Sequence, residues 1–169
     1  MLKLGDLLGL PVLEVETGAQ IGSVQEAVLD SNLTSVKCIL VTGSANGSGS
    51  KQILFHDLLN IGRDAITVRN SSVMVSDDLS AGQECTTQLH ELLQKEIFTE
   101  TGRNLGVLVD IIYDVASGKV QGYEVSDGII TDLICGRLLM PLPQAQVVGE
   151  DKVIVPDAMA SLLQDRHCE

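Results

Sequence analysis

The chain has 169 residues and a formal net charge of −12, and acidic residues exceed basic ones in both halves. A field of this sign repels phosphate backbones and anionic lipid surfaces, and the sequence has no Lys/Arg cluster to overcome it, so we expect no direct binding of nucleic acid. Hydrophobic residues make up 44% of the chain but aromatic residues only 2%, which favours strands packed through Val, Ile and Leu.

The first half begins with a segment that recurs later in the chain. TGAQIGSVQEAVLD at residues 17–30 reappears as TGRNLGVLVDIIYD at residues 101–114. A second segment, NIGRDAITV at 60–68, is matched by VVGEDKVIV at 147–155. Two blocks in the same order indicate a duplicated unit, with three more residues between the blocks in the second copy.

The duplication predicts a domain organisation. We expect a first barrel over residues 1–75, a linker over 76–88, and a second barrel with a C-terminal helix over 89–169. Each unit is near the size at which a hydrophobic core is only just sufficient, so packing the two together would help both.

Glycines mark the turns and bends of the first repeated block. Gly18 and Gly102 are expected to take positive φ in tight hairpin turns. Gly22 and Gly106 are expected to let a strand bend or bulge.

One acid lies inside the following strand of each copy, Glu26 in the first and Asp110 in the second. We expect each acid to share a strand face with the apolar residues two positions before and after it, which are Val24, Val28, Leu108 and Ile112. We favour a structural role near a barrel rim, with hydrogen bonds from turn amides, over a chemical role.

Asp30 and Asp114 end the repeated block and are expected to fold back on the backbone two residues on. Strands are predicted to follow at residues 36–41 and 120–125. Short strands separated by Gly- and Asp-rich turns favour a small all-β barrel in each half.

Three short helices are predicted outside the barrel strands, at residues 86–95, 128–135 and 157–164. The second has an apolar stripe, which provides the candidate partner-binding residues Ile129, Ile130, Leu133 and Ile134. Two interpretations stay open: this helix plugs its own barrel, or it covers the other barrel, a second subunit or a partner. Exposure of the stripe would favour a homodimer.

Sequence patterns for chemistry are weak. His56 and Asp57 are adjacent, but neighbouring residues on a strand point to opposite faces and no GxSxG nucleophile elbow exists. The four cysteines are far apart, although His167 and Cys168 are chemically capable of binding a metal together with Cys38, Cys85, Cys135 or His90. We expect no catalytic residues, no cofactor and no metal site.

Targeting signals are not apparent. No stretch reaches signal-peptide length or approaches the roughly 18 apolar residues of a membrane span. We therefore expect a cytoplasmic protein with reduced thiols and no membrane insertion.

The repeated blocks resemble a known family. LLGLPVLEVETGAQIGSVQEAVLD with GRDAITV, and LQKEIFTETGRNLGVLVDIIYD with GEDKVIV, are similar to the PRC-barrel domain, as two tandem copies over residues 3–73 and 89–156. The resemblance implies a mainly β fold of two small, partly open barrels used for docking or assembly, without shared catalytic residues. Relatives include the cytoplasmic part of the photosynthetic reaction-centre H subunit and a ribosome-maturation factor.

These observations lead us to expect a non-enzymatic bacterial adaptor that binds a protein partner through its barrels and short helices. One alternative is an accessory factor in ribosome assembly or RNA processing, which would contact a basic ribosomal protein rather than RNA. Another is a soluble regulator that docks on a membrane electron-transfer complex.

Overall fold

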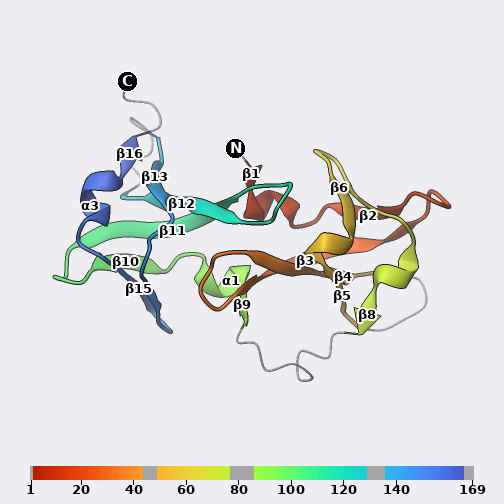
Figure 1. Ribbon diagram of the computed structural model, residues 1–169, viewed down its shortest axis with the longest axis horizontal. Helices are drawn as coiled ribbons and strands as arrows, with labels where there is room; N and C mark the ends of the chain where they lie inside the picture. The colour runs from red at the N-terminus through yellow and green to blue at the C-terminus, as the bar shows by residue number, and fades with distance from the viewer. Residues whose placement is uncertain (1, 44–48, 77–85, 129–135, 166–169) are drawn as a thin grey trace.

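The computed structural model describes residues 2–43, 49–76, 86–128 and 136–165. It is mainly β, with two curled sheets placed side by side along the long axis of the molecule (Figure 1). The first half of the chain forms the sheet on the right of the figure and the second half forms the sheet on the left.

The sheet of the first half has the strand order β6-β7-β2-β3-β4-β5-β8. Its strands are β2 (Pro11–Glu14), β3 (Gln20–Asp30), β4 (Val36–Thr42), β5 (Lys51–Leu54), β6 (Leu58–Ile61), β7 (Ile66–Val68) and β8 (Val75–Ser76). Single turns of 3-10 helix, η2 (Phe55–Asp57) and η3 (Ser71–Val73), precede β6 and β8. The pairs are antiparallel except for β2 with β7, which run parallel.

The sheet of the second half repeats that order strand for strand, as β14-β15-β10-β11-β12-β13-β16. Its strands are β10 (Glu96–Thr99), β11 (Asn104–Tyr113), β12 (Val120–Ser126), β13 (Leu138–Pro141), β14 (Val147–Val148), β15 (Lys152–Val155) and β16 (Gln164–Asp165). The registers also correspond, because Val12 lies opposite Gly22 and Ile66 just as Ile97 lies opposite Gly106 and Val153.

Two short strands cross between the halves. β1 (Leu2–Lys3) pairs with β11 of the second half, and β9 (Thr86–Gln88) pairs with β3 of the first. Each is followed by one helical turn, η1 (Leu4–Leu7) or α1 (Leu89–Leu92). The first and last residues of both turns are leucines that are at most 2% exposed: Leu4, Leu7, Leu89 and Leu92. We call β1–η1 and β9–α1 the arms; each arm packs on the long strand of the other half.

The tips of the two long hairpins also meet. An isolated antiparallel bridge joins Ser35 to Lys119, which occupy equivalent positions of the two copies. The Val36 amide donates to the Gly118 carbonyl at 2.8 Å, and the Val120 amide donates to the Thr34 carbonyl at the same distance. The bridge therefore lies on a pseudo-two-fold axis that relates the halves.

Both sheets bulge at the predicted glycines. Pairing shifts register where β2 faces Gly22 and where β10 faces Gly106. A Cβ at Gly106 would lie 2.4 Å from the Ser126 carbonyl oxygen, and Gly106 has a φ of 125°. Glycine is needed here for both its conformation and the close approach of the neighbouring strand.

A second bulge corrects the predicted strand faces. Pairing shifts between Val24 and Glu26, and again between Leu108 and Asp110. Val24 and Leu108 belong to the main core, whereas Val28 packs outside it with Cys38 and Leu40. The prediction that each acid shares a face with the apolar residues on both sides of it is wrong, because one extra residue reverses the alternation.

The helices predicted at 86–95 and 157–164 are present as single turns, α1 and α3 (Met159–Leu162). The first is shorter than predicted because residues 86–88 form the strand β9 and Leu93 is already extended, with a ψ of 139°. Residues 129–135 of the predicted helix at 128–135 lie outside the described residues, as do residues 44–48 of the glycine-rich segment at 42–51.

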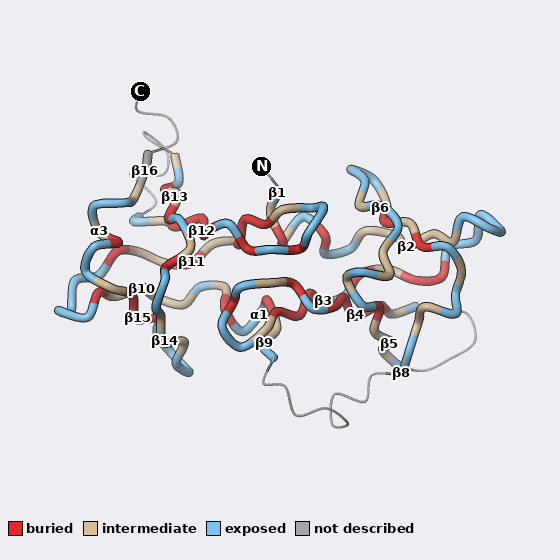
Figure 2. Tube along the Cα trace, viewed as in Figure 1, coloured by how far each residue is buried: buried red, intermediate tan, exposed pale blue. Residues whose placement is uncertain are grey.

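One hydrophobic core runs through both halves (Figure 2). It joins Ile39 and Ile53 of the first sheet to Ile111 and Tyr123 of the second, and the buried leucines of both arms belong to it. Phe55 of η2 packs edge-on against Tyr113 of β11, with ring centroids 6.4 Å apart. The sheets thus follow the sequence duplication, while the core is shared.

Leu4→Ala and Leu89→Ala should each lower the free energy of unfolding by about 2–5 kcal/mol, because each removes a fully buried leucine from an arm. Urea unfolding followed by circular dichroism should show one transition that shifts as a whole, since the core is shared. Leu162→Ala is the control; this leucine is 45% exposed, and the change should stay within about 0.5 kcal/mol. Two separate transitions, with only one of them shifted, would contradict a common core.

Candidate functional site

The acid of β3 meets the arm of the second half. Glu26 is 7% exposed, and its Oε2 lies 2.6 Å from Nδ1 of His90 in α1. Its Oε1 accepts a hydrogen bond from the Ala27 amide at 3.0 Å. Glu26 therefore fixes α1 against the long strand of the first half.

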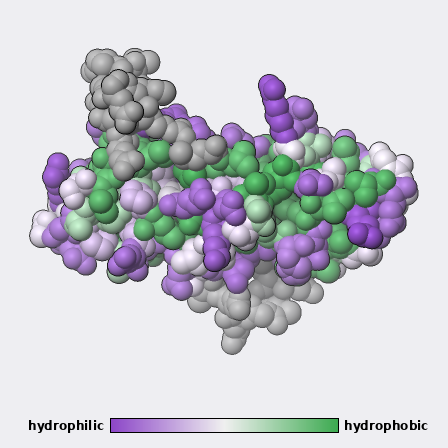
Figure 3. All heavy atoms as spheres, turned by 45° about the horizontal axis from the view of Figure 1, so that its top comes forward, coloured by the Kyte–Doolittle hydropathy of each residue, from purple (hydrophilic) through white to green (hydrophobic). Residues whose placement is uncertain are grey.

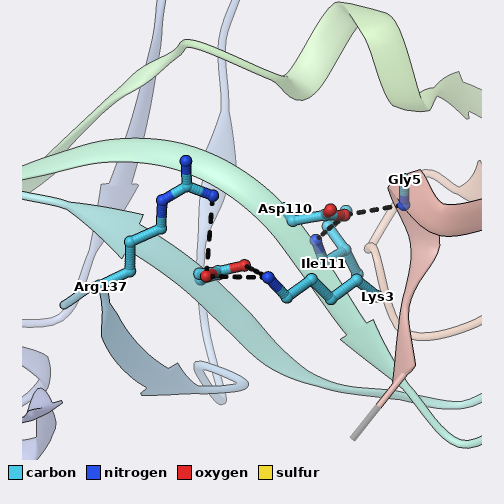
Figure 4. Close-up of polar contacts among 6 residues, drawn as sticks. Lys3, Gly5, Asp110, Ile111 and Arg137 are labelled. Carbon is cyan, nitrogen blue, oxygen red and sulfur yellow. Dashed lines mark hydrogen bonds and ion pairs between the residues drawn. The ribbon is translucent and has the colours of Figure 1, made fainter. Parts of the chain in front are cut away.

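The acid of β11 meets the arm of the first half in the equivalent place. Oδ1 of Asp110 accepts hydrogen bonds from the Gly5 amide at 2.9 Å and the Ile111 amide at 2.8 Å (Figure 4). A Cβ on Gly5 would lie 2.6 Å from Oδ2 of Asp110, so the lack of a side chain lets the η1 backbone come this close. One arm is thus held through an imidazole and the other through a backbone amide.

A second buried acid stands opposite Asp110 on β12. Glu124 is 2% exposed, and Nζ of Lys3 lies 2.9 Å from its Oε2 and 3.2 Å from its Oε1. Arg137 approaches the same carboxylate, with Nη1 3.8 Å from Oε1 (Figure 4). β1, β12 and the residue before β13 therefore converge on one carboxylate.

Sequence patterns did not predict a role for Glu124, Lys3 or Arg137, and they offered His90 only as a possible metal ligand. Glu124 occupies the position that Leu40 holds in the first copy, since Glu26 pairs with Leu40 as Asp110 pairs with Glu124. An acid at a position where the other copy has leucine could have identified Glu124 from the sequence. Lys3 and Arg137 had no such signal, because only the crossing of β1 and the placement of β13 bring them together.

Burial raises the pKa of Asp110 above its ordinary value, and the nearby carboxylates of Asp6 and Glu124 act in the same direction. The hydrogen bonds from Gly5 and Ile111 lower the pKa but do not offset the burial. Burial also raises the pKa of the Tyr113 hydroxyl, to about 12. The surroundings of β11 where the arm of the first half meets it therefore disfavour a further negative charge.

The remaining predicted turn residues act locally. Gly18 and Gly102 have φ values of 72° and 90° in the hairpin turns. Asp114 accepts hydrogen bonds from the Ser117 hydroxyl at 2.6 Å and the Ser117 amide at 2.9 Å, and these lower its pKa. Burial raises the pKa of Asp30, but hydrogen bonds from Thr34 and Ser35 outweigh it, so the net pKa is lowered. Asp30 reaches four and five residues ahead rather than two, whereas Asp114 reaches Ser117 three residues ahead and also, as predicted, the Ala116 amide two residues ahead.

Several sequence candidates lie outside the described residues. They are Ile129, Ile130, Leu133, Ile134, Cys85, Cys135, His167 and Cys168. Within the part of the chain that is described, no group of three or more His, Cys, Asp or Glu side chains is placed to hold a metal ion.

His56 and Asp57 lie in η2 rather than on a strand, with Nε2 3.6 Å from Oδ1. The expected strand geometry is therefore wrong for this pair, because the chain makes a helical turn before β6. The His56 side chain is 76% exposed.

A groove lies where η2 and β6 face the turn between β11 and β12. Its volume is about 480 Å³, and its walls include Phe55 and Leu59 on one side and Val115 on the other. Leu59 and Val115 are 47% and 38% exposed. Hydrophobic surface gathers toward the middle of the molecule and over its first half in Figure 3. The groove is thus an opening at the junction of the halves whose lining residues are mainly apolar but include His56, Asn60 and Ser117.

None of the helices in the described ranges has the length and apolar character to cross a membrane.

Lys3→Gln should lower the free energy of unfolding by about 1–3 kcal/mol, because it removes the nearest cation from a buried carboxylate. The counterparts of Lys3 and Glu124 in the other half are Gln88 and Leu40. The double variant Lys3→Gln/Glu124→Leu therefore places the residues of the other half at both positions. It should recover most of the lost stability, because the buried carboxylate is gone. A double-mutant cycle in urea measures the coupling. Strict additivity of the two changes would show that the pair is not coupled.

Asp110→Asn should become more stable relative to the wild type as the pH rises. A raised folded-state pKa means that the folded protein holds this proton more tightly than the unfolded chain, so ionisation costs wild-type stability from the ordinary value of 3.8 up through the folded pKa. Denaturant unfolding between about pH 2 and 7 measures this difference and also covers the range below 3.8 in which a lowered pKa acts.

Asp114→Asn provides a control of opposite sign for that experiment. The lowered pKa of Asp114 stabilises the wild type above 3.8, and this contribution is lost as the pH falls through the folded pKa. If the two variants changed with pH in the same direction, the assignment of the Asp110 pKa shift would be wrong.

Comparison with curated proteins found no match to this chain. The comparison with protein families supports the predicted resemblance to the PRC-barrel domain for the second copy and does not extend it to the first. Residues 87–161, which run from β9 to α3, match the family model of the PRC-barrel domain.

Proposed function

We propose that the protein is a non-enzymatic adaptor or assembly module of the cytoplasm that binds a basic protein partner. The observation that carries the proposal is the exposed apolar groove at the junction of the halves, on a chain with a net charge of −12. Apolar surface supplies affinity for a partner, and the charge selects partners of opposite sign.

The polar groups of the junction support a structural role rather than catalysis. Glu26 contacts His90, Asp110 accepts two backbone amides, and Glu124 lies between Lys3 and Arg137. Each acid is engaged by its own chain at the place where an arm is held. A general acid or base would instead need a carboxylate within reach of a substrate.

The match of residues 87–161 to the PRC-barrel domain supports the same class of function, because the resemblance implies docking and assembly. We extend the proposal to the first half as a second unit of the same type. Its identical strand order and its reciprocal arm support that extension.

A ribosome-assembly factor is the second candidate. The net charge of −12 favours it, since ribosomal proteins are basic and could supply the complementary surface. This role would use a protein contact and no direct contact with RNA.

The proposed function predicts that the tagged protein retains one or a few basic proteins from a lysate of its source organism, and that retention weakens as salt rises. Each retained protein would then be purified and titrated against the adaptor by calorimetry, where a defined stoichiometry is expected. Co-sedimentation with small ribosomal subunits would favour the second candidate. Failure of every purified candidate to bind would contradict the adaptor role.

A further inference from the structure

The two halves differ at the edge of each sheet. β14 is the end strand of the second sheet, and Gln146 stands immediately before it. Oε1 of Gln146 accepts a hydrogen bond from the Tyr123 hydroxyl at 2.6 Å, and its Nε2 donates to the Asn32 carbonyl at 3.0 Å. The Gln146 side chain thus links the edge of the second sheet to the hairpin turn of the first half. We call this pair of hydrogen bonds the tie.

The first half lacks the same tie. Ile66 and Val153 hold equivalent positions in the register of the two sheets. Applying the same offset in the sequence makes Leu59 the counterpart of Gln146. Matching the long hairpins in the same way makes Ile39 the counterpart of Tyr123. Leucine and isoleucine side chains cannot form a hydrogen-bonded bridge.

The groove lies where the tie is missing. Leu59 faces it from β6, and Ala116, the counterpart of Asn32, lies in its opposite wall. One of two equivalent junctions is therefore closed by an amide, and the other remains an open apolar groove of about 480 Å³.

The edge of β6 is also open. β6 ends its sheet, and no other described strand pairs with its outer side. An end strand presents unpaired amides and carbonyls that can pair with a strand from another chain. A strand added here would run beside the groove, so that its side chains could reach Phe55 and Leu59.

We propose that this groove is the docking site for an extended, basic segment of a partner protein, which adds to β6 as a strand and inserts alternate apolar side chains. The proposal rests on the proposed function and names the kind of partner it requires. Charge complementarity selects this occupant, because Asp57 and Asp114 adjoin the lining residues in sequence and the whole chain carries −12. A second copy would bring the same negative charge and is disfavoured.

The first test uses three fluorescein-labelled nine-residue peptides and fluorescence anisotropy. One alternates Lys and Val, one alternates Glu and Val, and one has the Lys/Val sequence with Pro in place of two central Val residues, which keeps every positive charge. Binding of the Lys/Val peptide should be saturable, with one site per chain. The Glu/Val peptide loses the charge match and the Pro peptide loses strand pairing, so each should bind at least about tenfold more weakly.

The decisive variant is Leu59→Gln, which places at this junction the residue that closes the other one. It should weaken binding of the Lys/Val peptide at least about tenfold. Leu162→Gln is the matched control, because this leucine is 45% exposed against 47% for Leu59 and lies on α3, away from the groove. Gln146→Leu removes the tie of the second half and should raise the number of peptide sites from one to two.

Circular dichroism and urea unfolding establish that each variant folds. If Leu59→Gln does not, Val115→Gln on the opposite wall replaces it with the same expected loss. Equal affinities for Leu59→Gln and Leu162→Gln would overturn the proposal. So would self-association that Leu59→Gln abolishes in sedimentation velocity, because the occupant would then be a second copy.

Failure here is distinguishable from failure of the proposed function. If a purified partner binds the wild type and Leu59→Gln equally, the adaptor role stands and the groove is not its site. If no partner binds at all, the adaptor role itself fails.

Discussion

The exchange of arms between the halves is the constraint on which the rest of the structure depends. β1 pairs with β11 and β9 pairs with β3, so each half completes the sheet of the other. Four leucines of the arms are buried as a consequence, and they join the two sheets into one core. A half of this size buries limited apolar surface alone, and sharing the core makes up the difference.

Polar contacts hold the arms in one register. A buried carboxylate is unfavourable unless it is hydrogen-bonded or paired, so Glu26, Asp110 and Glu124 each favour the arrangement that brings them a partner. The partners differ between the halves: an imidazole holds one arm, whereas a backbone amide and a lysine hold the other. The same backbone geometry is thus kept by different chemistry.

The asymmetry of the two copies has a structural consequence. Leu40 and Glu124 occupy equivalent places, as do Leu59 and Gln146, and the polar member of each pair lies in the second half. The polar side chains of the second half bind Asn32 and Lys3 of the first half, whereas their apolar counterparts leave an exposed groove beside β6. Substitution at two or three positions is therefore enough to make the two halves of the molecule differ in their surface.

The sequence by itself determined the duplication, the bulge glycines, the main strands and the mainly β class, because these depend on local spacing and on the conformational freedom of glycine. It did not determine which face Val28 and Val24 take, since one unpaired residue between them reverses the alternation. Nor did it determine the crossing of the arms or the meeting of Lys3, Glu124 and Arg137. Most of those contacts join segments far apart in the sequence, such as Lys3 with Glu124 and Val28 with Gln88, and only the tertiary pairing of strands decides which segments meet.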